Sequence, residues 1–189
     1  MLKEDVQRTD HLMEEKSIIE KSQHDPAHFR PLYEKYFKRI FLFVHRRVGD
    51  KAITADITSQ IFLQALTNIK NYEARGLPFS AWLFRIAINE CSNFFRKTKR
   101  DRLVSLDTDT VSELYEDLTS AYGLEDLHRQ LPDILARLSR EELQAIELRY
   151  FEQRPFREVA ELLGISETYA KVRVYRTLDK MKKLFTKSQ

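Results

Sequence analysis

Residues 155–185, PFREVAELLGISETYAKVRVYRTLDKMKKLF, constrain the fold of this chain more than any other stretch. Their first part predicts a short helix that Gly164 ends with a left-handed turn, after which Ser166 is placed to cap a second helix. Apolar residues then recur at three- and four-residue steps along one stripe: Ala170, Val174, Leu178, Met181 and Phe185. A short helix, a glycine turn and a longer helix with an exposed basic face are typical of a helix-turn-helix. The alternative is an ordinary helical hairpin with a solvated basic face, but the turn, the small Ala160 and the basic helix together favour DNA binding.

The composition favours a helical protein, because the 189 residues include only 4 Gly and 5 Pro and are rich in strong helix formers. The sequence has no convincing alternating strand pattern and no internal repeat. The single cysteine, Cys91, excludes an internal disulfide and fits a reducing cytosol. Because no segment resembles a signal peptide or a membrane span, we expect a cytoplasmic protein without direct membrane insertion.

The pattern divides the chain into four parts. Residues 1–24 are charged and poor in aromatic residues, which predicts a frayed N-terminal extension with at most a short helix. Residues 25–102 and residues 131–189 each predict a helical domain, the second of which contains the helix-turn-helix. Residues 103–130 carry seven acidic residues and a single basic one, which predicts a flexible acidic linker with a helical end near Leu124. The expected fold is therefore all-α, with two small helical domains joined by a flexible acidic linker.

Two helices open the first domain. Asp25 and Pro26 predict the start of one helix, and Gly49 followed by Asp50 predicts its end and the cap of the next. The second helix, about residues 51–69, turns one set of side chains outward: Asp56, Ser59, Gln60, Leu63 and Gln64. Periodicity alone does not distinguish a binding face here from a plain solvated surface.

A loop at residues 71–79 follows, punctuated by glycine and proline and carrying Tyr72 and Phe79. The long helix after it presents arginine and asparagine at four- and three-residue steps on one face: Arg85, Asn89, Asn93 and Arg96. It runs into residues 96–102, where five of seven residues are basic, including Lys97 and Arg100. A charge run is usually a solvated face, but beside this loop and this Arg/Asn face it is suited to hold phosphates and opened bases.

No catalytic, metal or cofactor site is predicted. His24 and His28 stand four apart, but no third or fourth ligand accompanies them. The sequence also has no phosphate-cradling glycine loop and no nucleophile elbow, so an enzyme has little support.

Two blocks of the sequence resemble the extracytoplasmic-function sigma factors of bacterial RNA polymerase, within the sigma-seventy family. ADITSQIFLQAL at 55–66 and FSAWLFRIAINECSNFFRKTKR at 79–100 are similar to region two of that family. LSREELQAIELRYFEQRPFREVAELLGISETYAKVRVYRTL at 138–178 is similar to region four. The helix-turn-helix alone is unspecific, whereas the FxAWLFRIAxN string paired with it is much more specific.

The resemblance implies a transcription initiation factor that binds core RNA polymerase and promoter DNA and acts without chemistry of its own. An anti-sigma factor is a further expected partner. The residues implied to bind core polymerase are Asp56, Ser59, Gln60, Leu63 and Gln64. Those implied to recognise and melt the minus-ten element are Tyr72, Phe79, Arg85, Asn89, Asn93, Arg96, Lys97 and Arg100. Those implied to read the minus-thirty-five element are Ser166, Thr168, Tyr169, Lys171, Arg173 and Arg176.

The sequence departs from the family at three places. Ser59-Gln60 stands where Gln-Glu is common, Asn93 stands where Asp is common, and Thr168-Tyr169-Ala170 replaces the usual Gly-Thr-Val. Bulky Tyr169 predicts a change in the preferred promoter sequence. The alternative hypothesis is a stand-alone helix-turn-helix regulator, which would bind duplex DNA by itself, usually as a dimer on paired half-sites.

Overall fold

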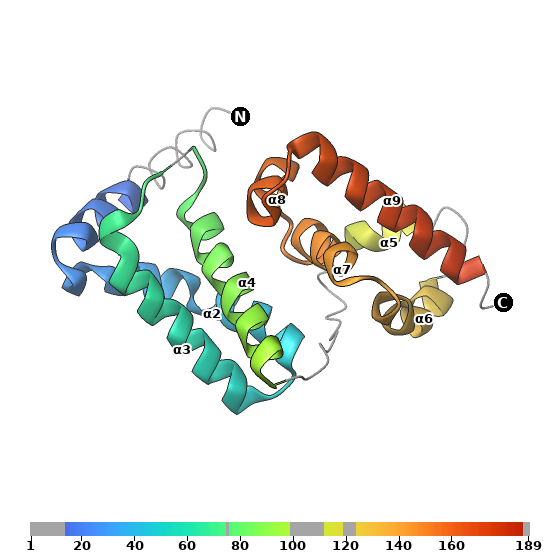
Figure 1. The fold of residues 1–189 in the computed structure, drawn as a ribbon, viewed down its shortest axis with the longest axis horizontal. Helices are drawn as coiled ribbons and strands as arrows, with labels where there is room; N and C mark the ends of the chain where they lie inside the picture. The colour runs from blue at the N-terminus through green and yellow to red at the C-terminus, as the bar shows by residue number, and fades with distance from the viewer. Residues whose placement is uncertain (1–13, 75, 99–111, 119–123, 187–189) are drawn as a thin grey trace. The chain divides into compact units, whose positions relative to one another are not determined.

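The computed structural model describes residues 14–74, 76–98, 112–118 and 124–186. Every regular element within these ranges is a helix, which confirms the predicted all-α class (Figure 1). The chain forms two compact units, Met1–Asp101 and Arg102–Gln189. The first unit is coloured blue to green in Figure 1 and the second yellow to red.

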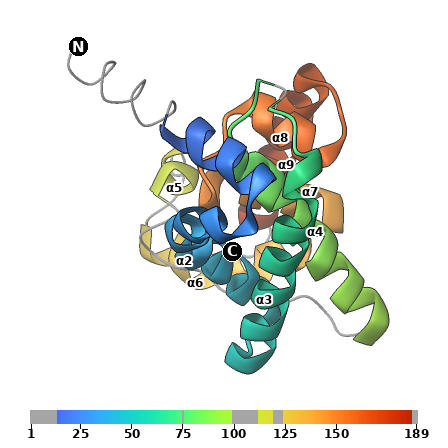
Figure 2. The same cartoon turned by 90° about the vertical axis from the view of Figure 1, so that its left-hand side faces the viewer.

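The first unit is built around a bundle of three helices. Its elements are a helix over residues 14–24, the 3-10 helix η1 (Pro26–Phe29), α2 (Arg30–Val48), α3 (Lys51–Asn68), the 3-10 helix η2 (Ile69–Asn71) and α4 (Phe79–Thr98). α2, α3 and α4 all pack against one another, as Figures 1 and 2 show from two sides. Ile40, Ile61 and Leu83 are fully buried between them, each contributing roughly 1.5–3 kcal/mol by leaving water.

The helix boundaries in this bundle follow local signals. The Asp25 carboxylate accepts a hydrogen bond from the backbone N–H of Ala27 at 2.9 Å, and the Asp50 carboxylate accepts one from Ile53 at 2.9 Å. Gly49 ends α2 with a left-handed φ of 74°, a conformation that costs glycine little. Both predicted caps are therefore confirmed.

The N-terminal segment differs from the expected extension. Residues 14–24 form a helix that packs on the first unit and buries Glu15, Ile19 and Ser22. The Tyr36 hydroxyl donates to the Glu15 carboxylate at 2.6 Å, and the Lys35 ammonium pairs with the same carboxylate. The short helix that the sequence allowed is therefore present, whereas the fraying predicted from the charged composition is not seen at residues 14–24, because a few of their side chains face inward. Residues 1–13 lie outside the described residues.

The second unit contains the helix-turn-helix and four preceding elements. The preceding elements are α5 (Ser112–Leu118), α6 (Leu124–Ala136), α7 (Arg140–Ile146) and the π-helix η5 (Glu147–Phe151), and the helix-turn-helix consists of α8 (Phe156–Leu163) and α9 (Glu167–Thr186). Its core is the predicted apolar stripe of α9 packed on α6 and α7, including Leu135, Ile146 and Val174. Gly164 takes a left-handed φ of 66° between α8 and α9, so the predicted turn is confirmed.

A capping box ties the start of α7 to α9. The Ser139 N–H donates to the Glu142 carboxylate at 2.7 Å, and the Glu142 N–H donates to the Ser139 hydroxyl at 3.3 Å. Lys180 of α9 donates to the same carboxylate at 2.6 Å. Burial alone would raise the pKa of Glu142, but the hydrogen bonds from Lys180 and Ser139, with the Lys180 charge, lower this pKa below its usual value.

Part of the predicted linker belongs to the core of the second unit. Leu114, Tyr115 and Leu118 of α5 are buried there. The Tyr150 hydroxyl donates to Asp117 at 2.6 Å, and Arg149 pairs with Glu113 at 3.3 Å. A flexible linker over the whole of 103–130 is therefore wrong at residues 112–118, because the acidic side chains of α5 flank an apolar face. Residues 99–111 and 119–123 lie outside the described residues.

The Tyr150 hydroxyl gives a test of this α5 attachment. Burial, followed by the hydrogen bond to Asp117 and its charge, raises the pKa of Tyr150. Tyr150→Phe is expected to destabilise the second unit by about 1.5–2 kcal/mol, since it removes a hydrogen bond to a charged group. Tyr175→Phe, which alters a ring that is 56% exposed, should change stability by less than about 0.5 kcal/mol.

Circular dichroism and tryptophan fluorescence, followed in the same urea titration, check this result. The only tryptophan, Trp82, lies in the first unit, so the fluorescence transition reports unfolding of that unit and should keep its midpoint. The dichroism transition that reports unfolding of the second unit should move to lower urea. Equal midpoints for Tyr150→Phe and wild type by dichroism would contradict a stabilising role for this bond.

Candidate functional sites

The outward side of α3 carries the residues predicted to bind core polymerase. Asp56, Ser59, Gln60 and Leu63 are all exposed, and Leu63 retains 56% of its accessible surface. Gln64 is different: it is half-buried, and its side-chain amide donates to the Glu90 carboxylate of α4 at 2.9 Å. α3 therefore offers a face of four exposed residues, with Gln64 turned toward the neighbouring helix.

An apolar pocket of about 350 Å³ adjoins Leu63. Its walls come from η1, the first turns of α2 and the end of α3, and include Tyr33, Phe62 and Leu66. The Tyr33 ring, 40% exposed, meets the Phe62 ring edge to face with 4.8 Å between centroids. Because Tyr33 and Leu63 both line this pocket, the α3 face continues into an exposed apolar hollow.

The loop after η2 places Tyr72 at the surface of the first unit. This residue is half-buried, and its ring lies 5.0 Å from the Trp82 ring between centroids. Burial, and then the negative charge of Glu15, raise the pKa of Tyr72, so the hydroxyl stays protonated well above neutral pH. A neutral aromatic ring at a loop is the kind of surface on which an unstacked base packs.

Phe79 does not share this exposure. It is 1% exposed, and its ring packs among Tyr36, Tyr72 and Trp82 at centroid distances of 5.2–5.8 Å. The prediction that Phe79 contacts DNA directly is therefore not supported by its position. An aromatic residue at the start of an amphipathic helix can face either the solvent or the core, and Phe79 faces the core.

The Arg/Asn face of α4 lies together as its spacing predicts. Arg85, Asn89, Arg96 and Lys97 are exposed along this side of the helix, and Asn93 is half-buried among them. Arg96 and Lys97 lie in the last turn. Arg100 lies outside the described residues.

Glu90 of α4 lies at the centre of a chain of hydrogen bonds on this face. Asn93 donates to the Glu90 carboxylate at 3.2 Å, and Arg96 donates to the Asn93 side-chain oxygen at 3.0 Å. Because Glu90 also accepts from Gln64, it joins the α3 and α4 surfaces. Glu90 was not among the predicted site residues, although its position three residues before Asn93 indicates such a contact.

The start of α9 presents the residues expected to read duplex DNA. Ser166 caps the helix, its hydroxyl accepting from the Tyr169 N–H at 3.2 Å. Thr168, Lys171 and Arg176 are exposed, with Lys171 paired to Glu167 at 2.8 Å. Backbone N–H groups and cationic side chains at a helix start are suited to phosphate contacts.

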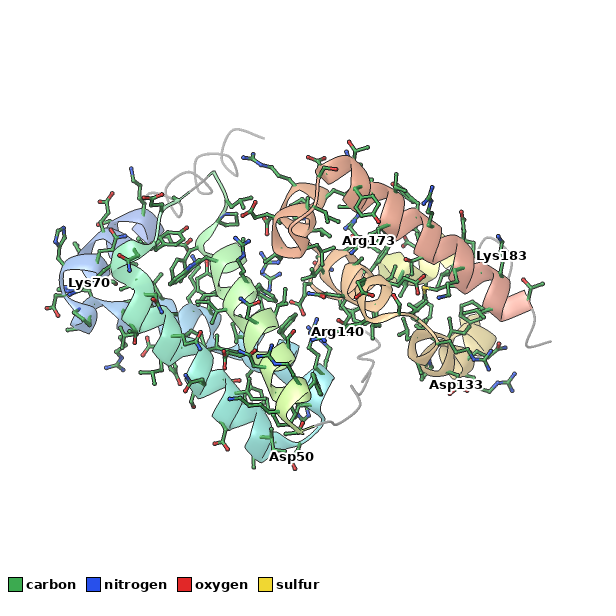
Figure 3. All side chains as sticks on the ribbon, in the orientation of Figure 1. Asp50, Lys70, Asp133, Arg140, Arg173 and Lys183 are labelled. Atoms are coloured by element: carbon green, nitrogen blue, oxygen red, sulfur yellow. The ribbon has the colours of Figure 1, made fainter. Side chains whose placement is uncertain are left out.

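Tyr169 and Arg173 act as a stacked pair on this helix. Tyr169 is 49% exposed, and the Arg173 guanidinium carbon lies 5.0 Å from the centre of its ring. Figure 3 labels Arg173 in the N-terminal half of α9 and Lys183 near the opposite end. Lys171, Arg173 and Arg176 lie in the first half of α9, and Lys180, Lys182 and Lys183 lie in its second half.

Comparison with known proteins identifies the family. The family model described as Sigma-70 region 2 matches residues 32–101, and that described as Sigma-70, region 4 matches residues 128–181. The chain is 32% identical over 174 residues to the ECF RNA polymerase sigma factor BldN of Streptomyces coelicolor. The chain belongs to the extracytoplasmic-function (ECF) sigma factors of the sigma-70 family. The similarity to BldN covers 88% of this sigma factor but 64% of BldN, slightly under two thirds of that relative.

Other relatives agree with this family. The sigma factor is 22% identical over 157 residues to the ECF RNA polymerase sigma factor SigM of Bacillus subtilis, covering 82% of this chain and 94% of SigM. Its fold is similar to that of CnrH, solved in complex with the cytosolic domain of CnrY, with a TM-score of 0.63 at 16% identity, covering 91% of this chain and 97% of CnrH. It is also similar to RpoE of Bartonella quintana, solved with the anti-sigma factor NepR, with a TM-score of 0.58 at 19% identity over 84% of this chain and 96% of RpoE.

The two family matches leave out parts of this sigma factor that the structure describes. The helix of residues 14–24 precedes the region 2 match, and α5 lies between the two matches.

Within the described ranges, no group of three or more His, Cys, Asp or Glu side chains is arranged to hold a metal ion. No helix in the described part of the chain has the length and apolar character needed to cross a membrane.

Proposed function

We propose that this sigma factor guides core RNA polymerase to its promoters and assists strand separation there, in the cytoplasm and without a covalent step of its own. The first unit docks on polymerase through Asp56, Ser59, Gln60 and Leu63 and holds the minus-ten element. The second unit contacts the minus-thirty-five duplex through the start of α9. The observation that supports this proposal is that the exposed face of α3 and the Arg/Asn face of α4 beside the aromatic loop belong to one unit, whereas the helix-turn-helix belongs to the other.

Strand separation requires stabilisation of unstacked bases. Unstacking costs a few kcal/mol per step, and stacking of a base on an aromatic ring returns about 1–3 kcal/mol. Tyr72 supplies such a ring at the loop, and Arg85, Asn89 and Arg96 supply donors for phosphates and base edges along α4. Contacts to polymerase must supply the remainder, which is why such a protein should open DNA only as part of the holoenzyme.

An anti-sigma factor is a further proposed partner. Two solved proteins of similar fold, CnrH and RpoE, were each captured with another protein, and NepR is described as an anti-sigma factor. The exposed α3 face with its apolar hollow is a surface that a competitor of polymerase could cover. Such a partner would hold this sigma factor inactive by occupying that face.

Run-off transcription tests the proposal. Purified sigma factor and core polymerase are incubated with genomic fragments, and discrete transcripts are expected only when both proteins are present. Binding of symmetric operators by the sigma factor alone, with no transcripts on adding core polymerase, would favour the stand-alone regulator instead. The mapped start sites would also supply the promoter DNA for the experiments below.

The Asn89 and Asn93 side chains give a prediction for strand opening. Replacing both with Ala removes amide groups from the middle of the α4 face and releases Arg96 from Asn93. At about 1–1.5 kcal/mol per lost hydrogen bond, the extent of opening should fall by roughly 30- to 150-fold. Permanganate reactivity of thymines in the minus-ten region measures this opening.

Two controls define the result. Asn68→Ala, at an exposed position of α3, should leave the permanganate pattern unchanged. Binding of the double variant to closed, upstream duplex should also match wild type. Normal thymine reactivity in the Asn89/Asn93 variant would remove this face of α4 from the melting site.

A further inference from the structure

Gln23 connects the N-terminal helix to the backbone at the start of the aromatic loop. Its side-chain amide nitrogen donates to the carbonyl oxygen of Tyr72 at 2.8 Å and to that of Ile69 at 3.1 Å. Both partners are carbonyl groups, which only accept, so the NH₂ side of the amide must face them. One side chain thus fixes both ends of η2 and the backbone from which the Tyr72 ring projects.

The helix that carries Gln23 is itself firmly held. The Glu15 side chain, 8% exposed, accepts from the Tyr36 hydroxyl at 2.6 Å and pairs with Lys35. Ile19 is buried one turn later. A carboxylate buried against two partners on α2 resists sliding or lifting of the helix, because movement would leave the charge unpaired away from water.

A pocket of about 320 Å³ separates this helix from the loop. Ile19, Glu20 and Gln23 line one side, and Tyr72, Leu77 and Pro78 line the other. Its volume lies at the low end of the range for small-molecule sites, about 300–1,000 Å³, which suits a single base more than a larger ligand. The loop also contains Gly76 at a left-handed φ of 70°, a conformation that glycine adopts readily.

We propose that Gln23 is a positioning residue for base capture: by holding the Tyr72 and Ile69 carbonyls, it keeps the Tyr72 ring and the loop in the conformation that receives an unstacked base. This inference rests on the proposed function of the loop. It adds the helix of residues 14–24, which precedes the region 2 match, to the minus-ten site. Gln23 acts through the loop backbone, and a base need not touch it.

Replacing Gln23 should therefore weaken capture of the base more than it weakens the fold. Gln23→Met has similar length but no donors, and Gln23→Lys keeps donors that can serve both carbonyls. His24→Met and His24→Lys, at the exposed neighbouring position, introduce the same residues as matched controls. Urea unfolding monitored through Trp82 fluorescence confirms that each variant retains the first unit.

The readout is a ratio of affinities measured on the holoenzyme. Fork-junction DNA carrying the mapped minus-ten element is compared with the same DNA lacking one base at each position in turn. For wild type, loss of the captured base should weaken binding by about fivefold to a hundredfold, the value of stacking for one base. In Gln23→Met this ratio should fall to about two or less, whereas Gln23→Lys and both His24 variants should keep the wild-type ratio.

The outcomes separate the possibilities. If Gln23→Met keeps the wild-type ratio, or loses affinity equally for intact and abasic DNA, Gln23 does not position the capturing loop. If Gln23→Lys behaves like Gln23→Met, the donated hydrogen bonds are not the cause and the proposal also fails. If removal of a base weakens binding of the wild type at no position, the protein does not capture a base. The proposed function of the loop and the role of Gln23 are then both wrong.

Discussion

Replacing Leu63 with aspartate is expected to weaken binding to core RNA polymerase by at least about a hundredfold, with little change in stability. Leu63 is 56% exposed on α3 and adjoins the apolar hollow formed by Tyr33, Phe62 and Leu66. Burying a leucine side chain that was exposed contributes about 1.5–3 kcal/mol, and about 2 kcal/mol corresponds to roughly 30-fold in affinity. An aspartate also brings a carboxylate that loses its water without gaining a partner, which raises the cost further.

Stability should hardly change, because this side chain makes few contacts within its own unit. Exposed substitutions usually shift the free energy of unfolding by about 0.5 kcal/mol or less. Leu42→Asp is the matched control, since Leu42 of α2 is 39% exposed and receives the same substitution. It should bind polymerase within about threefold of wild type, a difference of about 0.7 kcal/mol.

Fluorescence titration of labelled sigma factor with core polymerase measures both affinities. Wild-type affinity for Leu63→Asp would remove the α3 face from the polymerase interface. An equal loss for Leu63→Asp and Leu42→Asp would show that added negative charge on this unit, and not its position, is responsible.

The sequence predicted those features that depend on local signals. The caps at Asp25, Asp50 and Ser166 and the turn at Gly164 each depend on a few neighbouring residues, and each lies where the pattern placed it. The face of α4 was also predictable, because helical spacing determines which side chains share a side.

Features that depend on contacts distant in sequence were not predictable. The α5 helix lies in an acidic stretch, and its three buried residues join a core built from α6 to α9. Gln23 contacts backbone 46 and 49 residues further along the chain, which no local pattern reveals. Phe79 was assigned to DNA because an aromatic residue beside a loop suits a base as well as a core, and only its packing against Tyr36 and Trp82 separates the two.

Replacing Arg173 and Arg176 together with alanine is expected to weaken binding of the minus-thirty-five duplex strongly and to make it less sensitive to salt. Each phosphate contact releases condensed counterions, so the slope of log affinity against log salt should become shallower by up to about 0.9 per contact, which is between about one and two for the pair. At low salt, the loss of two charged contacts of up to about 1.5 kcal/mol each corresponds to at most about 150-fold in affinity.

The two arginines should not contribute equally. Arg176 is exposed, whereas Arg173 is half-buried beside the Tyr169 ring. The Glu141 pKa is lowered mainly by a hydrogen bond to its own backbone N–H and by one from Ser139, and also by the Arg173 charge. Since Arg173 already interacts within the unit, Arg176→Ala should flatten the salt slope by about one, and Arg173→Ala by less. Arg173→Ala should instead alter sequence preference, because Tyr169 loses its support.

Lys182 and Lys183 provide the matched control. They lie on the same helix, near its C-terminal end, where positive charge favours the helix dipole and need not contact DNA (Figure 3). Their double alanine variant removes the same charge but should keep the wild-type slope, as measured by fluorescence anisotropy of a labelled duplex over a range of potassium chloride. Equal flattening by the lysine and arginine pairs would mean that net charge controls binding. An unchanged slope in the arginine variant would remove this face of α9 from the DNA interface.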